Sequence, residues 1–220
     1  MKEDFLSYAA HEFRTPLTVL RGYAELLQSN PELAPEIAGR MIQGCERLER
    51  MIRALLLLTD LPKEVKWNSV LLSPILACCQ KNLLERYPEV QLQIVEDSLG
   101  IRLFVDPDLL EIALMNLLEN SVKYSDSPAR ITLIVKEDKE AIYLSVEDQG
   151  IGIASEHLPY VFNPFYSVDP IKCRKLGGVG LGLTIVRRIV EALRGRISFQ
   201  SYPGKGSCAT LILLRELPLQ

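Results

Sequence analysis

The sequence predicts a protein in two parts: a helical hairpin that forms a dimeric four-helix bundle, followed by an α/β sandwich with a mixed sheet. In roughly the first sixty of the 220 residues, apolar side chains recur at alternating spacings of three and four, the pattern of one helix face. After Leu61-Pro62 the pattern changes to short strands that alternate with further helices. We therefore expect one domain over residues 1–61 and a second over residues 62–217.

The apolar pattern of the first part indicates two helices. The stripe of the first helix consists of Leu6, Ala9, Phe13, Pro16, Leu20, Tyr23 and Leu27, and that of the second of Ile37, Met41, Gly44, Leu48, Met51, Leu55 and Leu58. Ser29-Asn30-Pro31 separates them, because proline forces its predecessor out of helical geometry. One hairpin with one stripe is too small for an independent core. Two hairpins paired across a two-fold axis would bury both stripes, so we predict a homodimer.

The second part predicts an α/β arrangement with helices on one face of a mixed sheet. Asp106 is the expected N-cap of its central helix, and Pro107 suits the first helical position. The expected strands are Val65–Val70, a pair of short ones at Gln91–Glu96 and Ile101–Val105, and the hairpins Ala129–Glu137 with Ala141–Glu147 and Arg196–Ser201 with Ser207–Leu214. The expected helices are Leu72–Arg86, Pro107–Tyr124 and Leu181–Leu193, the last after a long irregular stretch.

Composition and charge exclude several classes of function. The formal net charge of −3 gives no support for a nucleic-acid-binding surface. No apolar run approaches the ~18–20 residues that cross a bilayer, and no cleavable signal is recognisable. The five cysteines include no CxxC pair, so we expect reduced thiols in a cytoplasmic protein rather than a metal site.

The first chemical constellation surrounds His11, which the heptad pattern places on the solvent side of the first helix. Glu12 is its neighbour, and Thr15 follows one turn later on the same face. An exposed imidazole beside a carboxylate can act as a nucleophile. A lone surface histidine more often has no role. However, Pro16 removes a helical hydrogen bond and should kink the helix. Because such a proline destabilises the helix, its presence beside His11 favours a functional role for this segment.

The second constellation lies on the helix that precedes Tyr124. Asn116 and Asn120 are one turn apart, so their amides face the same way. Asparagine is a mediocre helix former, and two of them among leucines indicate a polar site at the edge of a core. An amide oxygen can bind Mg²⁺. Two solvent-facing amides without a ligand remain the alternative.

Two glycine-rich segments complete the pattern. Asp148-Gln149-Gly150-Ile151-Gly152-Ile153 follows a strand, and its glycines allow a ligand to approach the backbone closely. Gly177-Gly178-Val179-Gly180-Leu181-Gly182-Leu183 opens a helix, where backbone N–H groups can hold an anion. The second segment lacks the lysine of a P-loop and the strand context of a dinucleotide fingerprint. The stretch between them, with Lys172, Arg174 and Lys175, is long enough to be a mobile lid over a nucleotide.

In this order and at these distances, the constellations resemble the H, N, G1, F and G2 boxes of sensor histidine kinases, over nearly the whole chain. His11-Glu12-Phe13-Arg14-Thr15-Pro16-Leu17 resembles the dimerisation and histidine-phosphotransfer hairpin of that family. The sequence from Pro62 onward resembles its Bergerat-fold ATPase domain. The resemblance implies a protein-histidine kinase of a two-component system that uses ATP and Mg²⁺. It further implies phosphoryl transfer from His11 to an aspartate of a response regulator, with phosphatase activity toward that regulator.

The resemblance also implies roles for individual residues. His11 would be the phosphoacceptor, Glu12 the base that assists its attack, and Arg14 a helper near the phosphate. Thr15 would position water during dephosphorylation of the partner, Asn120 would bind Mg²⁺, and Asp148 would accept a hydrogen bond from the adenine amino group. The implied nucleotide-binding residues are Asn116, Asn120, Lys123, Tyr124, Asp148, Gly150, Gly152, Ile153, Phe165, Lys172, Arg174, Gly178, Gly180, Leu181 and Gly182.

Departures from the family pattern leave alternatives open. Ser167 stands where many relatives have arginine, so Lys172, Arg174 or Lys175 would have to contact the γ-phosphate, and Val179 replaces a frequent threonine. A degenerate nucleotide-binding dimer scaffold and a Bergerat-type serine kinase or ATPase are therefore the alternatives. The chain starts ten residues before His11, so we expect either a cytoplasmic core that belongs to a membrane-anchored sensor or a cytoplasmic protein with another source of input.

Overall fold

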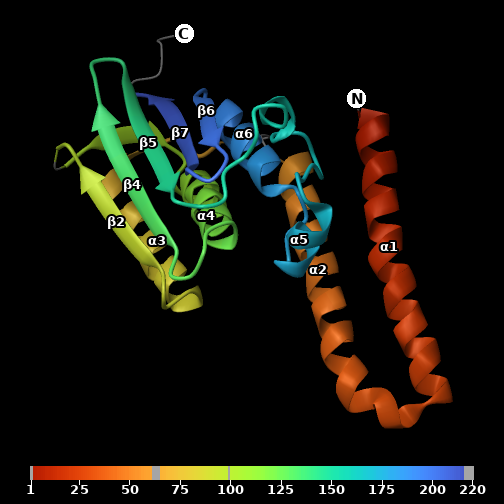
Figure 1. Cartoon of the computed structure of the whole chain (residues 1–220). Helices are drawn as coiled ribbons and strands as arrows, with labels where there is room; N and C mark the ends of the chain where they lie inside the picture. The colour runs from red at the N-terminus through yellow and green to blue at the C-terminus, as the bar shows by residue number, and fades with distance from the viewer. Residues whose placement is uncertain (1, 61–64, 99, 216–220) are drawn as a thin grey trace.

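The computed structural model describes residues 2–60, 65–98 and 100–215, and it contains the two predicted parts, a helical hairpin and an α/β domain (Figure 1). The predicted domain boundary at residues 61 and 62 lies outside the described residues. No helix in the described ranges is long and apolar enough to cross a membrane.

The hairpin consists of α1 (Lys2–Ser29), the short 3-10 helix η1 (Pro31–Leu33) and α2 (Ala34–Asp60). α1 continues through Pro16 as one helix. The two long helices meet at Gly44, where a Cβ atom would lie 2.9 Å from the Leu20 side chain. Because antiparallel helices have the same rise per residue, this contact places His11 at about the level of Arg53.

The predicted apolar stripes are largely covered within one hairpin. Ala9, Ile37 and Met51 are buried, and Met51 has no exposed surface. A second set of apolar side chains on the same helices remains exposed in the single chain: Leu17, Val19, Leu26, Ile42, Ile52 and Leu56. The expectation of one stripe per hairpin is therefore too simple, because the hairpin has both an inner and an outer apolar face.

The α/β domain contains all of the expected elements, although its first strand begins at Asn68 rather than at Val65. Its strands are β1 (Asn68–Leu71), β2 (Gln91–Glu96), β3 (Arg102–Val105), β4 (Arg130–Glu137), β5 (Ala141–Asp148), β6 (Arg196–Tyr202) and β7 (Gly206–Leu214). Its helices are α3 (Leu72–Arg86), α4 (Pro107–Lys123), the 3-10 turn η2 (Leu158–Tyr160), α5 (Pro170–Lys175) and α6 (Gly182–Ala192). The N-cap prediction is confirmed, since the Asp106 carboxylate accepts hydrogen bonds from the N–H groups of Asp108 and Leu109.

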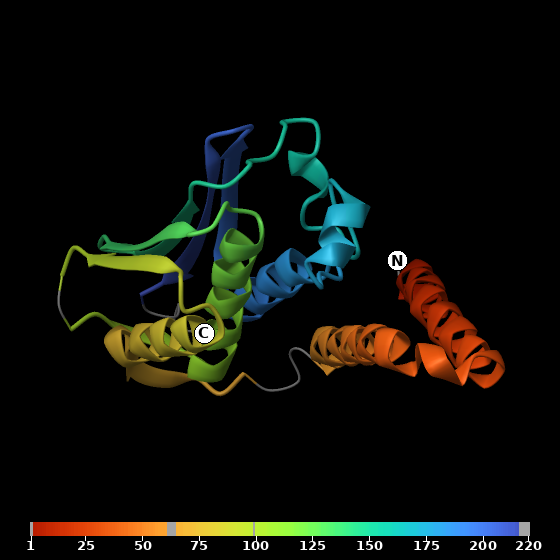
Figure 2. The same ribbon diagram turned by 60° about the horizontal axis from the view of Figure 1, so that its bottom comes forward.

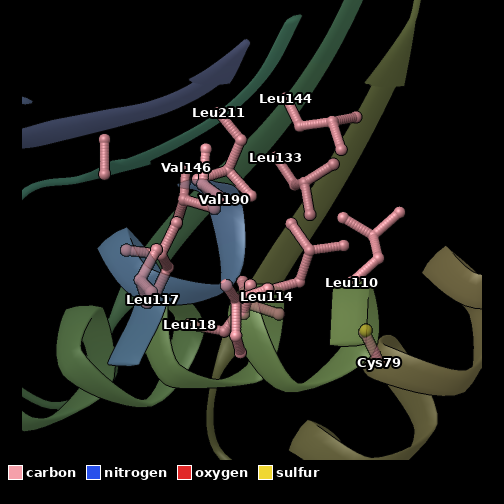
Figure 3. Close-up of a cluster of buried hydrophobic side chains, with 14 of the residues drawn as sticks. Cys79, Leu110, Leu114, Leu117, Leu118, Leu133, Leu144, Val146, Val190 and Leu211 are labelled. Carbon is pink, nitrogen blue, oxygen red and sulfur yellow. The ribbon is translucent and has the colours of Figure 1, made fainter. Parts of the chain in front are cut away.

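The main sheet has the strand order β2-β4-β5-β7-β6, with β2 and β4 parallel and the other neighbours antiparallel. The strands β2 and β3 do not pair with each other as their proximity in sequence suggested, because β3 pairs with β1 in a separate two-stranded sheet. Helices α3, α4 and α6 cover one face of the main sheet (Figure 2). Between them lies a core that includes Leu114, Leu133, Leu144, Val190 and Leu211 (Figure 3). This core holds α4 and α6 in place, and both helices line a large cavity.

Candidate functional site

A cavity of about 920 Å³ lies between α4, α6 and the segment from β5 to α6, with α2 at one side. Its wall includes these residues singled out by the sequence: Asn116, Asn120, Lys123, Tyr124, Asp148, Gly152, Ile153, Lys172, Gly178, Gly180, Leu181 and Gly182. The fold thus brings together three segments that are far apart in the chain: the asparagines of α4, the loop that begins at Asp148, and the glycine loop before α6.

In the cavity wall, Asp148 is held by three donors. Its Oδ1 accepts hydrogen bonds from the backbone N–H groups of Gly150 (2.9 Å) and Ser207 (3.1 Å), and its Oδ2 accepts one from the Ser121 hydroxyl (3.2 Å). Burial raises the pKa of the Asp148 carboxyl, and these three donors partly offset that rise. A fixed acceptor in a partly dry pocket can recognise an amino group on a flat ring.

Two glycines are required because backbone segments pass very close to one another. Gly152 has φ +65°, and a Cβ there would lie 1.9 Å from the carbonyl oxygen of Tyr202. A Cβ on Gly150 would lie 2.5 Å from the carbonyl oxygen of Tyr124. Gly150 is not part of the cavity wall; it lets the loop after β5 rest on the end of α4.

The polar face of α4 meets the start of α6. A Cβ on Gly182 would lie 3.3 Å from Asn116 Oδ1 and 3.4 Å from Asn120 Nδ2, so both amides face the first turn of α6. Asn116 Nδ2 donates to the Ile112 carbonyl at 2.8 Å. Lys123 Nζ lies 3.6 Å from a Glu119 carboxylate oxygen. In the described residues, no cluster of three His, Cys, Asp or Glu could hold a metal ion. A Mg²⁺ ion at this place would therefore be bound by amide oxygens of the protein together with oxygens of a bound phosphate.

The glycine loop before α6 is shaped by Phe165. Gly180 has φ +75°, and a Cβ there would lie 2.6 Å from the Phe165 carbonyl carbon. Phe165 is buried and is not part of the cavity wall, so it supports the loop from behind. Backbone N–H groups at the start of α6 remain available to an anion, as at other helix N-termini.

The lid contains a short helix that the sequence did not indicate. Asp169 Oδ1 accepts the N–H groups of Ile171 and Lys172, both at 2.9 Å, and so caps α5. Lys172 lines the cavity and Lys175 does not, while the side chain of Arg174 lies outside the described part. Ser167 also lines the cavity, and its hydroxyl donates to the Asp169 carbonyl at 3.1 Å.

Tyr124, the residue that follows α4, lines the cavity and lies against the lid. Its phenol adjoins Cys173 and Ser167, and burial is the main cause that raises the Tyr124 pKa, so the ring stays neutral.

His11 lies apart from the cavity. Its side chain is 72% exposed, and its Nδ1 is 3.9 Å from an oxygen of Glu12, whose side chain is only 17% exposed. The Thr15 hydroxyl donates a long hydrogen bond of 3.5 Å to the His11 carbonyl, and Arg14 is exposed. None of these four residues is part of the cavity wall. The described residues therefore contain two separate candidate sites, an exposed imidazole and a cavity at the N-terminus of α6.

Some residues of the cavity were not predicted from the sequence. Ser121 and Ser207 hold Asp148, while Arg50 and Arg53 come from α2. Ser121 lies one residue after Asn120 on α4, so its proximity to the predicted site could have been inferred from the sequence. Ser207 and the two arginines gave none, because they come from other parts of the chain.

Comparisons with known proteins match both parts. Residues 1–64 match the His Kinase A (phospho-acceptor) domain, and residues 105–217 match the histidine kinase-, DNA gyrase B-, and HSP90-like ATPase domain. The sensor histidine kinase WalK of Bacillus subtilis is 33% identical over 96% of this chain and 36% of its own length. The phosphate regulon sensor protein PhoR of Pseudomonas aeruginosa is 35% identical over 96% of this chain and 49% of its own length. The chain thus spans a third to a half of these curated relatives.

Solved structures show the same fold. The Acinetobacter baumannii histidine kinase AdeS superposes with a TM-score of 0.74 at 22% identity, covering 94% of this chain and 98% of that one. The histidine kinase ThkA, in complex with the response regulator protein TrrA, gives 0.80 at 18% identity, covering 97% and 61%. With both domain families matched in the order in which the hairpin and the α/β domain occur, the chain belongs to the sensor histidine kinases.

Proposed function

We propose that this chain binds ATP with Mg²⁺, phosphorylates its own His11 and passes the phosphoryl group to an aspartate of a response regulator. The observation that carries the proposal is the presence, in one chain, of an exposed imidazole beside a carboxylate and a cavity with polar groups suited to a nucleotide. Phosphoryl transfer needs mainly positioning and neutralisation of charge, which such a cavity supplies.

The position of Glu12 supports different roles for the two ring nitrogens of His11. Because the Glu12 carboxylate is on the Nδ1 side, it favours the tautomer with a proton on Nδ1 and leaves the lone pair on Nε2. Nε2 then attacks the terminal phosphorus, the bond to the bridging oxygen breaks, and ADP leaves with the electron pair. Glu12 stabilises the positive charge that develops on the ring.

Within the cavity, Asp148 receives the adenine amino group and the loop before α6 holds the phosphates. Asn120 binds Mg²⁺, and Asn116 fixes the neighbouring face of α4. Lys123 and Lys172 neutralise phosphate charge. Gly150 and Phe165 support the loops from outside the cavity wall. We propose residues 1–61 as the phosphotransfer domain and 62–217 as the ATP-binding domain, acting in the cytoplasm; free thiols at all five cysteines accord with that compartment.

The assay that tests the proposal is incubation of the chain with γ-labelled ATP and Mg²⁺. A histidine kinase gives protein-bound label that acid removes and base does not. A Bergerat-type serine kinase gives acid-stable label, and a degenerate scaffold binds nucleotide without label. Addition of receiver domains from response regulators should move the label to an aspartate of the correct partner.

The outer apolar face of the hairpin supports a homodimer. Leu56 is 56% exposed and Ile42 is 59% exposed, and two such faces can bury one another in a four-helix bundle. We expect sedimentation equilibrium at micromolar concentration to give twice the mass of the chain. A change of Ile42 to Glu should shift the protein toward the monomer, because the bundle would bury an unpaired charge. A monomeric mass for the unaltered chain would contradict the dimer.

We expect a substitution of Thr15 to impair dephosphorylation of the regulator much more than autophosphorylation. Its hydroxyl lies on the face of α1 that carries His11 and can position a water molecule against the phosphorylated regulator. Thr15→Ala should slow dephosphorylation of the partner about tenfold or more and change autophosphorylation by about twofold at most. Release of phosphate from the labelled regulator measures the first rate, and labelling of the kinase measures the second. An equal loss in both would show that Thr15 acts in the kinase step.

A further inference from the structure

The hairpin contributes directly to the wall of the nucleotide cavity. Arg50, Arg53, Ala54 and Leu57 of α2 line it, together with residues of α4, α6 and the lid. Helix α2 contacts α6, and the end of α2 nearest the α/β domain lies beside α6 in Figure 1. Nothing in the sequence pattern of α2 indicates this, because both arginines have a glutamate four residues earlier, as on an ordinary solvated helix face.

Arg50 is the α2 residue that reaches the glycine loop. A Cβ on Gly177 would lie 3.2 Å from Arg50 Nη2, so the guanidinium lies against the residue that begins the loop. Its ion pair with Glu46 is long, 3.8 Å, and its side chain is 44% exposed. A guanidinium has five N–H donors in a planar fork, so donors remain for an oxyanion at this position.

Most other cations of the wall are already paired with carboxylates. Arg86 and Lys123 both contact Glu119. Arg53 is hydrogen-bonded to Glu49 at 2.9 Å with 74% of its side chain exposed. Lys172 has no salt bridge within the described ranges. Arg50 and Lys172, together with Lys123, whose contact with Glu119 is also long at 3.6 Å, are thus the wall cations best able to turn to a phosphate.

The position of Arg50 also indicates which phosphate it meets. Asp148, the proposed partner of the adenine base, lines the cavity at the end of β5, and the first turn of α6 faces Asn116 and Asn120. Arg50 adjoins the other end of the loop, at Gly177. In the hairpin it lies within one turn of Arg53, the residue at about the level of His11. The terminal phosphate is the part of ATP that must come close to His11 for transfer to occur.

We infer that Arg50 is a nucleotide-binding residue that contacts the terminal phosphate of ATP, a role for which Ser167 offers only a hydroxyl. The inference rests on the proposed function. It makes α2 part of the ATP site, so that ATP holds the α/β domain against the hairpin more tightly than ADP, which lacks the terminal phosphate.

The test compares the affinities of the full chain for a non-hydrolysable ATP analogue and for ADP, by calorimetry with Mg²⁺. Arg50→Gln should weaken binding of the analogue about tenfold, the effect of losing one charge-assisted hydrogen bond, and change ADP binding by about twofold at most. Arg50→Lys should recover part of the loss, because the charge remains without the planar fork.

The matched control is Arg40→Gln. Arg40 is also on α2, also pairs with a glutamate four residues earlier, and does not line the cavity. It should leave both affinities unchanged. Equal affinities of Arg50→Gln and the unaltered chain, or an equal loss for the analogue and ADP, would overturn the role of Arg50 alone. Absence of ATP binding by the unaltered chain would instead overturn the proposed function.

Discussion

Replacing His11 with Gln should abolish the acid-labile label while ATP binding and thermal stability remain unchanged. Glutamine has a similar size but no nucleophilic ring nitrogen, so phosphorylation should fall about 10³-fold or more. His11 is 72% exposed and is not part of the cavity wall, so neither the fold nor the nucleotide site depends on it. Labelling with γ-labelled ATP, calorimetry and a melting curve measure the three quantities.

The other histidine of the chain provides the control. His157 Nδ1 lies 2.7 Å from the Tyr166 hydroxyl on the lid, and its side chain is 30% exposed. His157→Gln should retain the acid-labile label, because this ring is already engaged. Label that persists in His11→Gln but vanishes in His157→Gln would move the phosphoacceptor to the lid and contradict our assignment.

Replacing Asn120 with Ala should reduce autophosphorylation by about 10²-fold or more and leave the dimer intact. Asn120 lines the cavity beside Gly182, and its amide is the proposed protein ligand of Mg²⁺. Without it the ion cannot be held between the protein and the phosphates, and the charge that develops on the departing ADP is less neutralised. The hairpin is untouched, so the dimer mass should not change. Labelling across a Mg²⁺ titration, together with sedimentation, measures both effects.

Asn82→Ala is the corresponding control. Asn82 lies on α3, outside the nucleotide cavity, where its amide donates to a Glu111 carboxylate oxygen at 2.9 Å. Its removal should leave labelling within about twofold of the unaltered chain, as for other substitutions away from a site. Normal labelling in Asn120→Ala would remove Asn120 from the metal site.

The parts of the fold that follow from local patterns were predicted from the sequence. Helix α3 and strand β2 have the predicted bounds, because apolar spacing and flanking breakers act within a few residues. Asp106 and Pro107 begin α4 as predicted, since capping depends on the next two or three N–H groups. The four constellations around His11, Asn120, Asp148 and Gly180 could be named for the same reason.

What the sequence did not reveal depends on contacts between distant segments. The pairing of β1 with β3 follows from tertiary packing rather than from chain order. The short helix α5 depends on Asp169 as a cap inside a stretch without periodicity. Arg50 belongs to a helix face with an ordinary i,i+4 pattern, and only the docking of α2 beside α6 brings it into the cavity wall.

The hydrogen bond between Ser207 and Asp148 also bears on how the protein is made. Ser207 lies 59 residues after Asp148, on the last strand of the domain. A ribosome releases the chain from its N-terminus, and contacts between distant residues form late. His11 and Asn120 therefore leave the ribosome long before the N–H group that completes the support of Asp148. A nascent chain that ends before Ser207 therefore contains His11 and Asn120, but its Asp148 lacks one of the three hydrogen-bond donors that hold it in the complete domain.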